Sequence, residues 1–166
     1  MDFVSDLGRP FLAHRFRRLS ELLLAGNAPW MLERGIAAPP RSGSTLLLLK
    51  RRGPLSITDI AARLRLTHPL IIKLTDRLLE LGLVGQEADP RDARRRLISL
   101  TAEGLAEAGR LEAATAVIDR AYGELSEEVG VDLLALTEAL DAAVAREPLP
   151  ARLRRLAADV HEKEEA

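Results

Sequence analysis

The sequence predicts a mainly α-helical fold in which a two-stranded β-hairpin follows a pair of short helices. Three observations indicate this fold class. Apolar residues recur at helical spacing through most of the chain. Ser56, Thr67 and Thr101 stand where helix N-caps are expected. After Gly82 the helical period gives way to two strand-length runs, which are typical of a hairpin.

The first helix is predicted over residues 10–24. Four apolar residues recur within it at spacings of four, three and four, and the arginines between them lie off this stripe. Glycines and prolines over residues 26–40 then break the period. This break predicts a loop that holds a short turn around Trp30 and Met31.

A second helix is predicted over residues 41–52. It contains an apolar run from Leu46 to Leu49, and three basic residues follow this run. Gly53 and Pro54 then end the helix, because a glycine followed by a proline does not continue helical backbone.

Two short helices come next. Ser56 is the predicted N-cap of a helix that ends at Leu64, with Asp59 at the third helical position completing a capping-box-like start. Thr67 offers another N-cap, and the helix that follows is expected to end at Leu81, before a glycine C-cap. Two short helices joined by about three residues have the outline of a helix-turn-helix.

The hairpin is predicted from residues 83–87 and 96–100. Residues 88–93 separate these runs and are rich in Asp, Pro and Arg, which favours an exposed, basic turn. Thr101 then begins a helical C-terminal third that is interrupted near Ser126 and Gly130.

A last helix is predicted beyond Pro148 and Pro150. It carries apolar residues from Leu149 to Val160 at spacings of four, three and four. A helix-turn-helix, a hairpin and a long helix in this order predict a winged helix-turn-helix with flanking helices.

Charge is distributed unevenly along the chain. The total is 24 Lys and Arg against 25 Asp and Glu, but residues 41–96 hold 12 basic and 6 acidic side chains, a net charge of +6. Residues 97–166 hold 7 basic and 15 acidic side chains, a net charge of -8. A positive centre indicates a segment that binds a polyanion, and chance clustering of solvated charges is the alternative.

Several function classes lack their usual residues. The absence of cysteine excludes disulfides and thiolate chemistry, and His14, His68 and His161 are too dispersed for a histidine metal site. Phosphate-binding glycine motifs are also missing, so we expect no cofactor and no metal. Asp89 and Asp92 are the one acidic pair that would suit a hydrolase, and no nucleophile accompanies them, so we do not expect an enzyme.

The chain is expected to be cytoplasmic. Its longest stretch without a charged residue, 22–32, is 11 residues and contains a proline. A membrane-spanning helix needs about 20 apolar residues. The first residues include two aspartates and lack the apolar core of a signal peptide.

Five segments of the chain form a recognisable set: residues 55–64 (LSITDIAARL), 76–78 (DRL), 81–84 (LGLV), 89–94 (DPRDAR) and 100–104 (LTAEG). Together they resemble the MarR family of bacterial transcription regulators. The resemblance is specific over residues 45–104, and outside this range only the order of helices agrees.

The resemblance implies a homodimer that binds a palindromic DNA operator, most simply as a repressor. Residues 1–40 would form an N-terminal dimerisation helix and loop, residues 41–100 the winged helix-turn-helix DNA-binding domain, and residues 101–166 a C-terminal helical dimerisation region. In many members of the family, a small phenolic or aromatic ligand binds between the dimer region and the winged domain and relieves DNA binding. The alternative is a winged-helix interaction or dimerisation module without specific DNA binding, which the apolar Leu70 and Ile72 would favour.

The DNA-binding candidates come from the two motif helices and the wing. The second motif helix would enter the major groove, and arginines of the wing would reach the minor groove, where the Asp-x-Arg pair of the family maps onto Asp92 and Arg94. Each candidate also has a structural interpretation: Arg77 can pair with Asp76 or Glu80, and helix capping alone explains Ser56. The full set is Ser56, Thr58, Thr67, His68, Leu70, Lys73, Arg77, Arg91, Asp92, Arg94 and Arg95.

The ligand-binding candidates are aromatic and polar residues of the first helix, the loop after it and the C-terminal helices. For Phe16, packing in the core or the dimer is the preferred interpretation. The set is His14, Arg15, Phe16, Trp30, Met31 and Tyr122.

Overall fold

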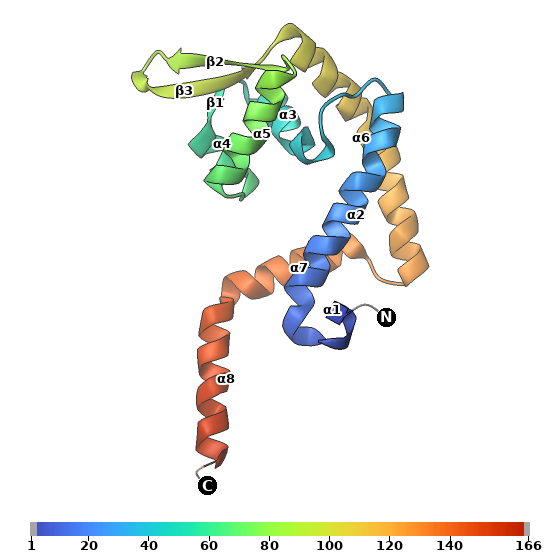
Figure 1. Ribbon diagram of the computed structural model, residues 1–166, viewed down its shortest axis with the longest axis vertical. Coiled ribbons are helices and arrows are strands. Elements are labelled where there is room, and N and C mark those ends of the chain that lie inside the picture. The colour runs from blue at the N-terminus through green and yellow to red at the C-terminus, as the bar shows by residue number, and fades with distance from the viewer. Residues whose placement is uncertain (1–2, 165–166) are drawn as a thin grey trace. The chain divides into compact units, whose positions relative to one another are not determined.

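The computed structural model describes residues 3–164, with the side chains of residues 3–92 and 95–158 (Figure 1). The chain divides into two compact units, residues 1–115 and 116–166. Within the described residues, every helix is too short or too polar to cross a membrane. In chain order the elements are α1 (Phe3–Asp6), η1 (Arg9–Phe11), α2 (Leu12–Glu33), η2 (Pro40–Ser42), α3 (Gly43–Arg52), β1 (Leu55–Ser56), α4 (Ile57–Leu64), α5 (His68–Glu80), β2 (Val84–Asp89), β3 (Asp92–Leu100), α6 (Ala102–Val129), α7 (Leu133–Arg146) and α8 (Leu149–Glu164).

The helix-turn-helix of α4 and α5 is confirmed, and its ends follow from local chemistry. The Asp59 N–H donates to Ser56 Oγ at 3.2 Å, which caps α4. Thr67 stands at the N-cap of α5, but its hydroxyl makes no capping hydrogen bond. At the other end Gly82 adopts φ +67°, and its N–H donates to the Leu79 carbonyl at 2.9 Å. This left-handed glycine is the C-cap that the sequence predicts.

The wing is a longer hairpin than the sequence predicts. Strands β2 and β3 are antiparallel, and only Pro90 and Arg91 separate them, so most of the predicted 88–93 turn is strand. The hairpin projects away from α4 and α5 in Figure 1. A third strand, β1, pairs with β3 on the side away from β2 and was not predicted, because two residues carry no periodic signal.

The first unit has one apolar core, to which α3, α4, α5, the sheet and the start of α6 each contribute. Leu46, Ile60, Ile71, Leu78 and Ile98 are almost fully buried in it. Burial on this scale contributes roughly 1.5–3 kcal/mol for each large apolar side chain. The core therefore fixes α5 and the base of the wing relative to each other.

The predicted loop after the first helix is wrong over residues 25–33. Helix α2 continues to Glu33 with Pro29 inside it. A proline inside a helix costs about 3 kcal/mol, but Met31 is only 3% exposed and belongs to the core. Burial of the Met31 side chain offsets part of this cost, and the loop is confined to residues 34–39.

The second unit contains the end of α6 with α7 and α8, and its breaks agree with the sequence. Gly130 has φ +68° just after α6, and the Asp132 carboxylate accepts the N–H of Ala135 at 2.9 Å to cap α7. Among its described side chains, residues 116–158, none is buried in the single chain. This unit therefore has no core of its own within one copy.

Candidate DNA-binding surface and adjoining pocket

The outer face of α5 is formed by the residues that its amphipathic pattern leaves off the core. Ile71, Leu74 and Leu78 are buried, and the Thr75 hydroxyl donates to the Ile71 carbonyl of its own helix at 2.8 Å. His68, Ile72 and Lys73 are exposed. The same helix thus packs one side into the core and presents a cation and an apolar side chain on the other.

Two other DNA-binding candidates on α5, Arg77 and Leu70, do not point freely into solvent. Arg77 Nη1 donates to Glu80 Oε2 at 2.6 Å, which is the intrahelical pairing that the sequence allowed. Leu70 is half-buried against the core and lines a pocket, so it is not a residue of the outer face.

The tip of the wing is tightly turned and exposes an arginine. The Arg91 N–H donates to Asp89 Oδ1 at 2.9 Å, and the Arg91 side chain is exposed. Asp92, the first residue of β3, is also exposed. The Arg94 side chain lies outside the described residues.

Arg95, the next wing arginine, is turned toward α4 instead. Its Nη2 donates to Asp59 Oδ2 at 2.7 Å and to Ser56 Oγ at 3.0 Å. The hydrogen bond from the Ser56 hydroxyl and the nearby charge of Arg95 hold the pKa of Asp59 below its ordinary value. Ser56 is buried and its hydroxyl is engaged in capping, whereas Thr58 in the same turn is exposed.

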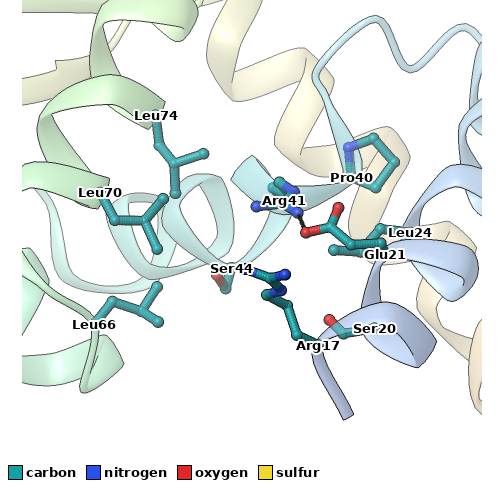
Figure 2. Close-up of a pocket in the computed structure, with 10 residues that line it drawn as sticks. All are labelled: Arg17, Ser20, Glu21, Leu24, Pro40, Arg41, Ser44, Leu66, Leu70 and Leu74. Atoms are coloured by element: carbon teal, nitrogen blue, oxygen red, sulfur yellow. Dashed lines mark ion pairs between the residues drawn. The ribbon is translucent and has the colours of Figure 1, made fainter. Parts of the chain in front are cut away.

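A pocket of about 460 Å³ lies between α2 and α5, and η2 with the start of α3 closes one side (Figure 2). Leu66, Leu70 and Leu74 form an apolar wall, and the side chains of α2 face them across the opening in Figure 2. Arg17 and Arg41 supply positive charge.

The charged side of this pocket contains an ion pair. Arg41 pairs with Glu21, and this hydrogen bond is the main cause that lowers the pKa of Glu21. A neighbouring cavity of about 420 Å³ shares Glu21, Arg41, Leu70 and Leu74 with the pocket and is also lined by Lys73 and Arg77. Helix α5 thus borders both cavities.

The comparisons with known proteins agree with this geometry. Residues 39–95 match the MarR family. This segment is a MarR-family domain. No curated protein matches the chain. The family assignment confirms the resemblance that the helix, wing and capping motifs carry.

Solved structures share the same fold. A probable transcriptional regulator from Pseudomonas aeruginosa is 27% identical with a TM-score of 0.58, over 81% of this chain and 95% of that chain. The transcriptional repressor CouR, solved bound to a 23-mer DNA duplex, is 25% identical with a TM-score of 0.60. The match covers 81% of this chain and 92% of CouR. The PcaV transcriptional regulator from Streptomyces coelicolor, solved with its natural ligand, is 24% identical with a TM-score of 0.63, over 89% and 96%.

The ligand candidates chosen from the sequence do not line the pocket beside the MarR-family domain. Arg15 and Phe16 line a separate groove on the exposed face of α2, and His14 is exposed on the same helix. Trp30 is half-buried beneath the Arg34 guanidinium, 5.0 Å from the ring centre, and Met31 is a core residue. Tyr122 belongs to the second unit.

The pocket was missed because its wall comes from separate segments. The sequence predicts Leu74 in the core and Leu70 on the DNA-facing side of α5, and Arg17 lies off the apolar stripe of the first helix. The usable signal was helical spacing, because Arg17, Ser20, Glu21 and Leu24 follow one another at three, one and three residues and so share one face of α2. Within the described residues, no cluster of His, Asp or Glu could hold a metal ion.

Proposed function

We propose that the chain is a homodimeric transcription regulator that acts as a repressor at a palindromic operator and is released by a small aromatic ligand. The observation that carries the proposal is that α5 and the wing tip each expose a cation, Lys73 and Arg91, on the surface of the winged helix-turn-helix. This surface lies in a MarR-family domain within a segment of net charge +6. CouR, which has the same fold, was solved on a DNA duplex.

In this proposal α5 enters the major groove. Lys73 donates to a phosphate or to guanine O6 and N7, and His68 in the first helical turn donates to a neighbouring group. Ile72 contacts a thymine methyl group, so readout combines polar and apolar contacts. Arg91 at the wing tip, together with Arg94, enters the adjacent minor groove, whose negative potential attracts guanidinium groups.

The test starts from selection of bound fragments from random duplex DNA. Against the selected operator, Lys73→Ala is expected to weaken binding by about 1–3 kcal/mol, because one direct contact is lost. Arg120→Ala, which removes an exposed arginine from α6, is the charge-matched control and should leave affinity nearly unchanged.

Salt dependence separates the two candidate functions. About six or more phosphate contacts give a steep linear loss of affinity with the logarithm of salt concentration. Little binding at any salt, with no enriched sequence, would contradict the proposal and favour the interaction module.

A second copy of the chain is the partner that we propose for the exposed apolar helices. Phe16 and Leu19 on α2 are 46% and 51% exposed, and Leu134 and Leu153 in the second unit are 69% and 58% exposed. Large apolar side chains that gather on the exposed face of a helix mark an interaction surface. A twofold pair would also place two copies of α5 about 34 Å apart, one turn of duplex DNA.

The pocket between α2 and α5 suits a small aromatic carboxylate. A volume of about 460 Å³ is within the usual range for small-molecule sites, roughly 300–1,000 Å³. The leucine wall would contact the ring, and Arg41 or Arg17 would bind the carboxylate. Helix α5 carries both the pocket residues and Lys73. A ligand in the pocket would therefore contact the same helix that is proposed to bind DNA.

A further inference from the structure

The side chain of Arg95 connects the wing to the first helix of the helix-turn-helix. Its Nη2 reaches Asp59 Oδ2 at 2.7 Å and Ser56 Oγ at 3.0 Å. The Ser56 hydroxyl in turn donates to Asp59 Oδ2 at 2.6 Å and accepts the Asp59 N–H at 3.2 Å. The three residues therefore form a closed network, in which each partner of Arg95 is already held by the other.

This network lies where the sheet stops supporting the wing. Strand β1 pairs with β3 only at Ile98 and Leu97, so residues 92–96 extend past the end of β1. Arg95 is in this outer part of β3, whereas Ser56 is in β1 and Asp59 in the first turn of α4. The network therefore provides a side-chain connection just beyond the last backbone pairing of β1 with β3.

We propose that Arg95 is a positioning residue that fixes the direction of the wing relative to α5, and that it does not itself contact DNA. The inference rests on the proposed function, because wing direction matters only if the wing enters a groove. With its guanidinium engaged at the base of the wing, Arg95 leaves the groove contact to Arg91 and Arg94 at the tip. The lowered pKa of Asp59 keeps its carboxylate ionised and the network intact at neutral pH.

The substitution Asp59→Asn distinguishes positioning from direct contact by the sign of its effect. It removes a negative charge near DNA and leaves the Ser56 cap on the backbone N–H in place. If Arg95 were a groove contact, this change would leave affinity unchanged or raise it. Positioning predicts the opposite: affinity falls about threefold to tenfold, or about 0.7–1.4 kcal/mol, although the protein has become more positive.

The double variant Arg95→Ala/Asp59→Asn completes a double-mutant cycle between these two residues. Residues that act as one unit show non-additive effects, so Asp59→Asn is expected to change little once Arg95 has been removed. Additive effects of the two substitutions would overturn the inference. Arg95→Lys retains the positive charge without the planar fork, and should weaken binding in the same direction as Arg95→Ala.

A measurement on the free protein keeps this inference separate from DNA binding. Amide hydrogen exchange of residues 86–92 should be faster in Asp59→Asn and Arg95→Ala than in the wild type, while exchange in the core of α5 is unchanged. Arg96→Ala, an exposed arginine on the same strand, is the matched control and should leave exchange at the wild-type rate. If amide exchange in the wing is unchanged in both variants, the positioning role is overturned. If the wild-type protein binds no operator, only the proposed function is contradicted.

Discussion

Gly104 lies in the first turn of α6, where the backbone of the helix touches the turn that follows α5. A Cβ built on this glycine would lie 1.7 Å from the Leu83 carbonyl oxygen. Thr101 secures the same junction, because its hydroxyl donates to the Gly82 carbonyl at 2.7 Å and accepts the Gly104 N–H at 3.0 Å. The start of α6 is thus docked against the end of the recognition helix.

Gly104→Ala is expected to destabilise the protein. The new methyl group meets backbone atoms, and overpacking of this kind costs typically 1–3 kcal/mol, more than the gain of roughly 0.5–1 kcal/mol from replacing a helical glycine with alanine. Chemical denaturation would measure the change in the free energy of unfolding. Gly26→Ala is the control, because nothing lies within 4 Å of its Cβ position, and it should stabilise α2. Equal effects of the two substitutions would contradict this account.

Single residues could be predicted where their role is local. Ser56 and Gly82 were placed correctly as caps, because capping depends on a few neighbouring backbone groups. The partners of Arg95 and Glu21 could not be predicted, because Arg95 is 36 residues from Asp59 and Glu21 pairs with a residue of another helix. Long-range ion pairs between exposed side chains leave no periodic pattern in the sequence.

At the scale of elements, boundaries were predicted where burial and propensity agree. The range of α4 followed its caps, and the break between α6 and α7 falls near Gly130 as predicted, whereas α2 continued through Pro29, with Met31 of its last turn buried in the core. The loop after α2 is then held by a contact with α6: the Ala38 N–H donates to the buried Glu107 carboxylate at 2.7 Å. Tertiary contacts of this kind decide where a helix ends and which residues face a pocket.

We propose α5 as the element through which a ligand controls DNA binding. Isothermal titration with a panel of salicylate-like aromatics should detect binding, and Arg41→Ala should weaken carboxylate binding by about 1.5–3 kcal/mol, because a charged hydrogen bond is lost. Arg34→Ala, outside the pocket lining, is the control. Operator DNA should lower ligand affinity by the same factor as ligand lowers DNA affinity. Ligand binding with no effect on DNA affinity would contradict release through α5.

At the scale of the whole molecule, the two units differ in where their apolar residues lie. The first has a buried core, whereas residues 116–158 expose leucines and valines along α7 and α8. The sequence predicted these stripes, because amphipathic periodicity is visible in any helix. The amphipathic period does not show which surface packs against these stripes. A second copy that presents the same stripes is the occupant we propose.

Leu153→Glu is expected to break this association. It places a charge on the apolar stripe of α8, so the dimer should dissociate in sedimentation experiments at micromolar concentration, and operator affinity should fall because two half-sites are no longer held together. The wild type should melt at a temperature that rises with protein concentration, as expected when folding is coupled to assembly. Ala158→Glu adds the same charge about 180° around α8 from Leu149, given 100° per residue, and should leave the dimer intact. A wild-type monomer that binds the operator with full affinity would contradict the twofold arrangement.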